Sequence, residues 1–199
     1  SFGATYKGKK SCNLSTIGST SFFPSKPLGC YGDAGALFTD DGELAEKFRW
    51  IRVHGQERKQ HHPILGLNGR MDTLQATILL AILEVFPEEV VKRHEIGSRY
   101  NTELSKAPGI ETPTIALENT SVFAQYTILS EQRESIQSSL KDKDIPSVSY
   151  YSVPLHLQPV FKDLGYKADD FPITERIANQ CLSLPMSPYL SLSDQEKVI

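Results

Sequence analysis

Lys26 stands in a segment whose composition favours amine chemistry. Pro24 and Pro27 bracket it and restrict the backbone on both sides. The apolar residues Phe22 and Leu28 can pack this loop against a core and withdraw the lysine from water. Withdrawal from water lowers the pKa of an ammonium group, which makes a lysine a usable nucleophile or base. The segment therefore favours a lysine that condenses with a carbonyl compound to form a Schiff base.

Groups suited to a phosphate ligand flank this lysine. Ser21 precedes it and offers a hydroxyl that can donate a hydrogen bond to a phosphate. Gly29, Gly32 and Gly35 follow it, and glycine allows the backbone to approach a ligand closely. The pattern indicates a Schiff-base lysine beside a phosphate-binding position. A surface lysine in an ordinary turn explains the same residues, so both interpretations stay open on these residues alone.

A second glycine-rich segment precedes the most apolar helix that the sequence predicts. Gly66 and Gly69 flank Asn68, and Arg70 follows where this helix is expected to begin. The amide of Asn68 and the free N–H groups of a helix N-terminus can bind an anion there. The alternative is turn and capping chemistry alone, with Asp72 in the first helical turn.

Two adjacent tyrosines, Tyr150 and Tyr151, stand near the end of a predicted strand and before a proline-rich loop. Phenol groups in that position can form hydrogen bonds with a sugar or a nucleotide. Simple packing at the end of a strand is the alternative interpretation of the same pair.

Several other catalytic motifs are missing from the sequence. His61 and His62 are adjacent, so that their side chains diverge, and no HxxxH or HExxH spacing occurs. A metal site built by the protein is therefore not expected. The sequence also contains no G-x-S-x-G elbow of a serine hydrolase, no P-loop and no G-x-G-x-x-G.

Charge and cysteine usage narrow the partners and the compartment. The chain has 21 Lys and Arg against 24 Asp and Glu, a net charge of −3, which argues against a general nucleic-acid binder. No apolar run in the sequence is long enough to span a membrane. Cys12, Cys30 and Cys181 form no CxxC pair and no disulfide framework, which is typical of a reducing, cytoplasmic setting.

Hydrophobic periodicity and turn residues predict the elements that position these groups. In the first half they predict a strand at 36–39 and helices at 43–54, 71–86 and 88–106, with Pro87 breaking or kinking the helical run. In the second half they predict a strand at 121–129, a helix at 131–143, a strand at 147–153 and a helix at 174–182. The helix at 71–86 is apolar on nearly every side, which indicates burial on several sides, including against a second subunit. The order of elements from residue 107 onward indicates a small α+β domain.

Taken in order along the chain, these segments resemble one family. Ser-Phe-Phe-Pro-Ser-Lys-Pro-Leu-Gly at 21–29, followed by Gly-Asp-x-Gly-Ala at 32–36, resembles the cofactor-lysine segment of the DegT/DnrJ/EryC1/StrS family of sugar aminotransferases, which use pyridoxal phosphate (PLP). Further motifs extend the resemblance over nearly the whole chain: His54-Gly55, Gly66-x-Asn68-x-Arg70-Met71-Asp72, Leu74-Gln75-Ala76, Pro154-Leu155-His156 and Leu182-Ser183-Leu184-Pro185-Met186. The chain is most similar to members that aminate the 3-oxo group of a UDP-linked N-acetylhexuronate for O-antigen or lipopolysaccharide sugars.

The resemblance implies an α/β chain with the aspartate aminotransferase-like fold, the PLP-dependent transferase fold type I. Residues 1–106 would form the C-terminal part of the large PLP-binding domain. Residues 107–199 would form a small α+β C-terminal domain that is truncated at its end. The family places the aspartate that pairs with the pyridine nitrogen just before the residues equivalent to Ser1, so the chain is expected to be a C-terminal portion with little or no activity alone.

The resemblance also implies the roles of the residues at the two glycine-rich segments. Lys26 would bind PLP covalently and move a proton during transamination, and Ser21 would contact the cofactor phosphate. Asn68 would reach the cofactor phosphate of the neighbouring subunit. Arg70 would bind substrate near the same interface, so that a homodimer would share its active sites.

The same resemblance places Tyr150 and Tyr151 in the substrate pocket, where glutamate would donate its amine to a keto-sugar nucleotide. Neither nucleic acid, a membrane nor a metal ion would take part. A 4-oxo sugar aminotransferase is one alternative, and a non-catalytic or regulatory member that keeps the fold is another. Dehydratases of the family replace the Schiff-base lysine by histidine, and Lys26 argues against that chemistry.

Overall fold

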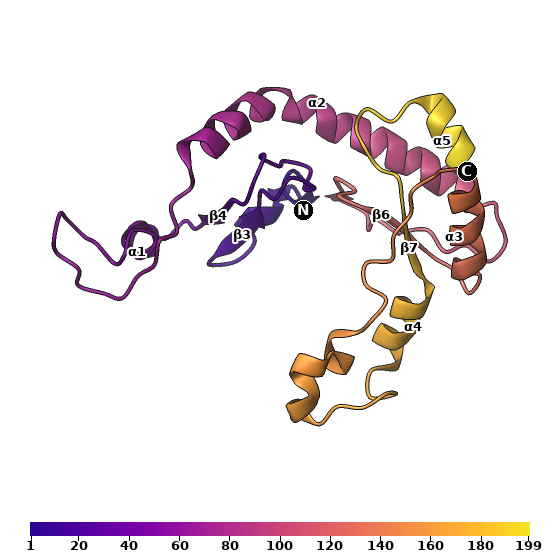
Figure 1. Ribbon diagram of the computed structural model, residues 1–199. Helices are drawn as coiled ribbons and strands as arrows, with labels where there is room; N and C mark the ends of the chain where they lie inside the picture. Colours follow the sequence, from indigo (N-terminus) through magenta and orange to yellow (C-terminus); the bar gives the residue numbers. More distant parts are fainter. The chain divides into compact units, whose positions relative to one another are not determined.

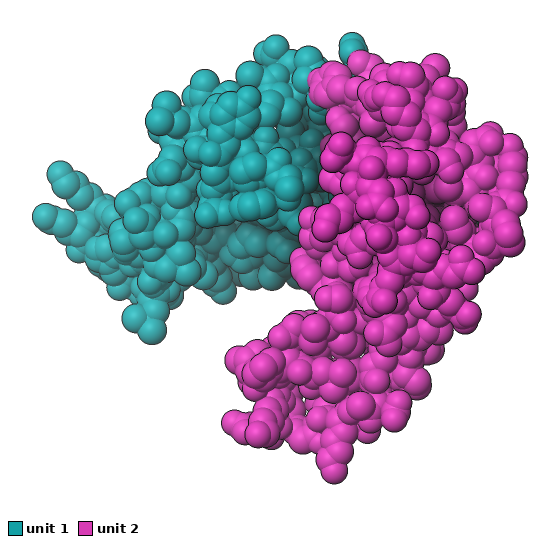
Figure 2. Space-filling view, turned by 45° about the vertical axis from the view of Figure 1, so that its right-hand side comes forward, with its two compact units in different colours: residues 1–91, 115–124 teal, residues 92–114, 125–199 magenta.

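The computed structural model describes the whole chain, residues 1–199. Two compact units divide it (Figure 2): residues 1–91 and 115–124 form unit 1, and residues 92–114 and 125–199 form unit 2. One long helix contributes to both units, because the division falls after residue 91, within that helix. The expected domain boundary between residues 106 and 107 lies beyond the end of the same helix, and it stays a prediction.

The elements of both units are short, apart from this helix (Figure 1). Unit 1 contains β1 (Thr5–Tyr6), β2 (Lys9–Lys10), η1 (Ser11–Asn13), β3 (Gly18–Ser21), β4 (Gly35–Phe38), α1 (Gly42–Ile51), β5 (Asn119–Thr120) and the first part of α2 (Thr73–Leu104). Unit 2 contains the rest of α2 and β6 (Tyr126–Leu129), α3 (Arg133–Asp142), η2 (Leu155–Leu157), η3 (Pro159–Leu164), α4 (Pro172–Gln180), β7 (Cys181–Leu184) and α5 (Leu192–Val198).

β3 and β4 pair antiparallel and form the hairpin that carries the lysine segment. Gly18 lies opposite Phe38, and Ser21 lies opposite Gly35. In a separate three-stranded sheet, β1 pairs with both β2 and β5. Lys26 therefore stands in the loop of residues 22–34, whose two ends are joined by a strand pair.

The core of unit 1 joins this loop to α2. Phe22, Leu28 and Cys30 from the loop are buried together with Leu79 and Phe86 from α2. Burying a side chain of the size of leucine or phenylalanine contributes about 1.5–3 kcal/mol to stability. The apolar residues beside Lys26 anchor the loop to a core, as the sequence predicts.

The core of unit 2 is built on the antiparallel pair of β6 and β7, with Leu129 opposite Cys181. All four residues of β7 are buried. The rings of Tyr100 and Tyr126 lie 4.7 Å apart, and the Tyr100 hydroxyl donates to the carbonyl oxygen of Pro185 at 3.0 Å. Burial raises the pKa of Tyr100 to about 12.

The helices confirm part of the prediction and correct the rest. α1 begins where expected, and the Asp41 side chain accepts hydrogen bonds from the first-turn N–H groups of Glu43 and Leu44. Pro87, however, does not end a helix, because α2 runs through it. A proline removes one backbone hydrogen bond, but the helix around Pro87 is packed on the core, with Phe86 buried and Val90 partly buried against it. Neither α2 nor any other helix combines the length and the apolar character that a membrane crossing needs.

Two strand predictions are too long, and β7 is a strand where a helix is predicted. Of the expected strand at 121–129, only β6 pairs in unit 2. Of the expected strand at 147–153, only Val148 forms a bridge, with Ser183. The predicted helix at 174–182 ends at Gln180, and Cys181 begins β7. A short apolar run fits a helix end and a buried strand equally well, so periodicity alone could not separate them.

Candidate active site

Backbone hydrogen bonds hold the loop around Lys26 in a fixed conformation. The Lys26 N–H donates to the carbonyl oxygen of Phe23 at 2.8 Å, which closes a tight turn. The Phe22 N–H donates to Ala34 and the Cys30 N–H donates to Phe22, each at 2.8 Å. Because Phe22 and Leu28 are also buried, both the ends and the middle of the loop are anchored.

The side chain of Lys26 is exposed, whereas the neighbouring Pro27 is buried. The structure gives the Lys26 ammonium group neither an ion pair nor a hydrogen bond. The expectation that the apolar flanks withdraw the amine from water is therefore wrong for this chain. The flanks pack downward into the core and leave the amine accessible on a rigid loop, free to react with a ligand.

Ser21 ends β3 at the start of the same loop. Its Oγ accepts a hydrogen bond from the Phe23 N–H at 3.2 Å. The hydroxyl proton remains available, so Ser21 can donate to a ligand oxygen while its position is held by the turn. The side chain is exposed, as a phosphate contact requires.

Gly29 is required by the close approach of the loop to itself. A Cβ atom at this position would lie 2.8 Å from the carbonyl oxygen of Phe23 and 2.9 Å from that of Pro24. Both atoms belong to the backbone of the lysine turn, so that they cannot move without displacing Lys26. Glycine at 29 thus permits the conformation that presents the lysine.

Gln75, which the sequence offers only as part of the family motif Leu74-Gln75-Ala76, joins α2 to the lysine loop. Its Oε1 accepts a hydrogen bond from the Tyr31 N–H at 2.8 Å. A Cβ at Gly32 would lie 3.0 Å from Nε2 of the same side chain. Helix periodicity could not reveal this contact, because its partner lies 44 positions away in the sequence.

Asn68 and Arg70 lie on another loop of unit 1, which returns along the end of α1. The Val53 and Asn68 backbones form a bridge, and the Gly69 N–H donates to the carbonyl oxygen of Arg52 at 2.8 Å. Arg70 Nη1 lies 3.3 Å from His54 Nε2, which orients the guanidinium group. Both predicted side chains are exposed, and the structure gives them no hydrogen bond or ion pair with Lys26 or Ser21.

The helix that follows Arg70 begins later than expected. α2 starts at Thr73 and not at Met71, so Asp72 precedes the helix instead of lying in its first turn. The free N–H groups at the N-terminus of α2 therefore belong to residues from Thr73 onward and not to the segment around Asn68. What remains of the predicted anion site on this segment is the exposed amide of Asn68 and the exposed guanidinium of Arg70.

Tyr150 and Tyr151 belong to unit 2 and lie in a turn, not at the end of a strand. Their exposed fractions are 44% and 76%, and their rings meet edge to face with centroids 5.6 Å apart. Packing at a strand end, the alternative interpretation, does not apply, because both phenols are open to solvent.

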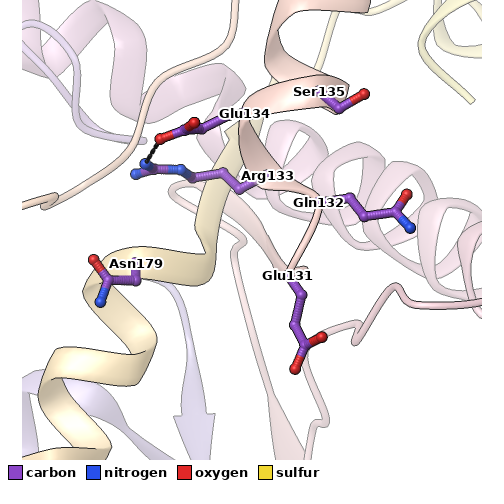
Figure 3. Close-up of a pocket in the computed structure, with 6 residues that line it drawn as sticks. All are labelled: Glu131, Gln132, Arg133, Glu134, Ser135 and Asn179. Atoms are coloured by element: carbon purple, nitrogen blue, oxygen red, sulfur yellow. Dashed lines mark hydrogen bonds and ion pairs between the residues drawn. The ribbon is translucent and has the colours of Figure 1, made fainter.

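A polar depression of about 520 Å³ lies on unit 2, and none of the predicted site residues lines it (Figure 3). Its lining residues are Glu131, Gln132, Arg133, Glu134, Ser135 and Asn179. Arg133 forms an ion pair with Glu134 at 3.2 Å and donates to Ser149 Oγ at 3.4 Å. The arginine is thus committed to structural contacts, and the depression contains no group that the predicted chemistry uses.

Comparisons with known proteins agree with the order of these motifs. The model of the DegT/DnrJ/EryC1/StrS aminotransferase family matches residues 1–199. A UDP-2-acetamido-2-deoxy-3-oxo-D-glucuronate aminotransferase from Pseudomonas aeruginosa is 53% identical over 96% of this chain and 52% of its own length. The crystal structure of a DegT/DnrJ/EryC1/StrS aminotransferase from Brucella abortus is 40% identical, with a TM-score of 0.93 over 100% of this chain and 53% of that one. NtdA from Bacillus subtilis, solved with bound PMP, is 33% identical, with a TM-score of 0.83 over 92% of this chain and 44% of that one.

The fold is accordingly that of the PLP-dependent transferases of fold type I. The chain belongs to the DegT/DnrJ/EryC1/StrS aminotransferase family. It spans about half the length of the curated relatives that it matches. Aminotransferases of this family depend on PLP.

The residues of the lysine loop fit this cofactor. The amine of Lys26 is unpaired and accessible, as covalent attachment to an aldehyde requires. The Ser21 hydroxyl keeps a proton for a phosphate oxygen. The loop that carries both is fixed by Gly29 and by the core, so little ordering remains to be done when the cofactor binds.

Proposed function

We propose that this chain forms part of an aminotransferase that moves the amine of glutamate to a keto-sugar nucleotide. The acceptor is a UDP-linked 3-oxo-N-acetylhexuronate, and the product serves the biosynthesis of O-antigen, lipopolysaccharide or a related glycan. The observation that carries the proposal is the unpaired Lys26 amine on a rigid loop beside a serine hydroxyl. The choice of sugar is supported by the 53% identity to the P. aeruginosa enzyme.

The residues of the lysine loop have distinct tasks in this reaction. PLP, when bound, supplies the electron sink for the carbon that exchanges its amine. Lys26 would hold the cofactor covalently through Nζ, and once the amine of the donor has replaced Nζ in that bond, the released Nζ would take and return the proton at that carbon. Ser21 donates its hydroxyl proton to the cofactor phosphate and fixes the orientation of the ring system relative to Lys26.

Four further side chains complete the proposed site. Asn68 donates its amide to the cofactor phosphate of a neighbouring subunit, and Arg70 binds an anionic group of the substrate. Tyr150 and Tyr151 offer phenol groups and ring faces to the sugar nucleotide. The exposure of all four side chains supports these roles, because none is used up by contacts inside the core.

A homodimer with shared active sites follows from the role of Asn68. The exposed apolar side of α2 supports an assembly of this kind. Leu79 and Phe86 are buried in the core, whereas Leu74 and Leu80 have exposed fractions of 77% and 66%. Apolar patches of this type usually mark surfaces that are covered by other polypeptide. Action in the cytoplasm accords with the cysteines, which are all free thiols.

The direct test is amine transfer by the complete polypeptide that contains this chain. Enzyme saturated with PLP is mixed with glutamate and, in parallel, with 3-oxo and 4-oxo nucleotide sugars, and 2-oxoglutarate and amino sugar are measured. We expect the UDP-linked 3-oxo-hexuronate to react fastest. Preference for a 4-oxo sugar would overturn the substrate, and the absence of amine transfer with every acceptor would overturn the function.

A Lys26→Ala variant and a matched control locate the activity in this chain. Lys26→Ala is expected to abolish turnover, because no other group of the loop can replace the amine. Lys47→Ala is the control, since Lys47 is an exposed lysine on α1, where alanine is well tolerated. Equal loss of activity in both variants would contradict the assignment of Lys26.

A further inference from the structure

The carboxylate of Glu175, in the first turns of α4, gathers three hydrogen-bond donors from outside its own helix. The Asp169 N–H donates to both carboxylate oxygens at 2.9 and 3.0 Å, and the Phe171 N–H donates at 3.4 Å. His156 Nε2 lies 3.1 Å from Oε1. The side chains of His156 and Glu175 are only 8% and 16% exposed. A carboxylate with this many donors ties His156 to the start of α4 and to the residues just before that helix.

Aromatic packing reinforces the same junction. The ring of His156 lies 4.7 Å from that of Phe171, and Phe171 lies 5.1 Å from Tyr166. The imidazole is therefore held on one side by the carboxylate and on another by an aromatic ring. Its position, and with it that of η2, is set by α4 and the residues just before it.

The segment from Ser149 to His156 contains Tyr150 and Tyr151. His156 is held at one end of it by Glu175, and a second contact ties Ser149, at the other end, to the end of α4. The Ser149 hydroxyl donates to the carbonyl oxygen of Cys181 at 2.8 Å. Cys181 directly follows the last residue of α4. The residues between Ser149 and His156, which include Tyr150 and Tyr151, thus form a loop with both ends fixed to the same helix and its first following residue.

The charge of the carboxylate is maintained by its surroundings. Hydrogen bonding from the Asp169 backbone lowers the pKa of Glu175, burial raises it, and the hydrogen bond from His156 lowers it again, with a net lowering. The group is thus an acceptor for every donor around it. A glutamine at this position would turn an NH₂ group toward N–H donors and lose at least one of these contacts.

We propose that Glu175, acting through His156, is a positioning residue that fixes the segment from Ser149 to His156 so that Tyr150 and Tyr151 meet the sugar nucleotide. The inference rests on the proposed function, in which the two tyrosines bind that substrate. Clamping both ends of a short loop removes most of the conformations that it could otherwise explore. The substrate then binds a preformed surface and does not have to order the segment itself.

The kinetics of the two half-reactions distinguish a positioning role from a general structural role, because loss of structure would impair both half-reactions. Amine transfer divides into a donor half-reaction with glutamate and an acceptor half-reaction with the keto-sugar. In the holoenzyme of the complete polypeptide, Glu175→Gln is expected to raise KM for the keto-sugar by about tenfold, with the donor half-reaction changed by less than about twofold. Glu131→Gln is the control, because Glu131 is exposed just before α3 and the structure gives its carboxylate neither a hydrogen bond nor an ion pair.

A second variant releases the other end of the loop. Ser149→Ala removes the hydroxyl that donates to Cys181 and accepts from Arg133, and it is expected to raise the same KM while leaving the donor half-reaction intact. If Glu175→Gln fails to fold, the Ser149→Ala variant alone tests the proposal. Equal loss of both half-reactions in the folded variants, or unchanged kinetics in both, would overturn the positioning role. A wild-type enzyme that catalyses neither half-reaction would instead overturn the proposed function.

Discussion

Gln75 Oε1 accepts a hydrogen bond from the main-chain N–H of Tyr31 at 2.8 Å. This bond joins the first turn of α2 to the loop that carries Lys26, and burial of Leu79 and Phe86 against Phe22 and Leu28 continues the same junction. The lysine loop is therefore not an isolated turn. Its conformation depends on α2, so changes on that helix should reach the proposed cofactor site.

Replacing Gln75 tests this dependence. Gln75→Leu removes the acceptor and leaves the Tyr31 N–H without its partner, so the free energy of unfolding should fall by about 0.5–1.5 kcal/mol. We also expect weaker retention of PLP, measured by dialysis of the loaded enzyme. Gln75→Glu keeps an oxygen acceptor and should retain PLP nearly as well as wild type. Equal retention in Gln75→Leu and wild type would show that the bond does not support the loop.

Gly29 should not tolerate a side chain. The methyl group of Gly29→Ala would press on the carbonyl oxygens of Phe23 and Pro24, and the turn that holds Lys26 would have to shift. Overpacking of this kind costs about 1–3 kcal/mol in stability, and PLP binding should weaken as well. Gly42→Ala is the control, since a Cβ there meets no atom within 4 Å. Thermal unfolding and cofactor titration measure both effects, and a Gly29→Ala protein identical to the control would contradict the argument.

Arg70 should act on substrate affinity and not on stability. Its guanidinium group is exposed and has His54 as its hydrogen-bond partner, so that Arg70→Ala leaves the core unchanged. We expect KM for the anionic keto-sugar to rise by about tenfold. Arg49→Ala, at an exposed position of α1, should leave KM unaltered. A normal KM in Arg70→Ala would remove Arg70 from the substrate site.

The stability of the chain should depend on alkaline pH through Tyr100. Burial raises the pKa of Tyr100 to about 12, above the value of 10.0 for a free tyrosine. The buried neutral phenol therefore contributes stability that is fully present below pH 10 and is lost as the pH rises through about 12. Urea unfolding midpoints measured across this range should fall with pH in wild type. In Tyr100→Phe the fall should be smaller, and identical slopes would contradict the assignment.

The sequence predicts the lysine loop well because the determinants of that loop are local. Two prolines, a buried phenylalanine and Gly29 all act within a few residues of Lys26. The exposure of the amine could not be predicted, because it depends on which side of the loop faces the core. Contacts over long sequence separations, such as Gln75 with Tyr31 and Glu175 with His156, leave no periodic signal.

The strand and helix errors have the same origin. Pro87 is a helix breaker by its own chemistry, yet α2 continues through it where Phe86 is buried in the core and Val90 packs against that core. β7 is a four-residue, fully buried segment, Cys-Leu-Ser-Leu, whose pairing with β6 is a tertiary property. Motif order along the chain carried the family assignment further than local element prediction did, since it does not depend on element boundaries.

The most direct test of the central claim is chemical trapping at Lys26. The complete polypeptide is saturated with PLP, reduced with borohydride, digested and analysed by mass spectrometry, with Lys26→Ala in parallel. We predict a visible absorbance band before reduction and a phosphopyridoxyl adduct on the Lys26 peptide, both absent from the variant. A wild-type protein that shows no band and no adduct at Lys26 would contradict the account.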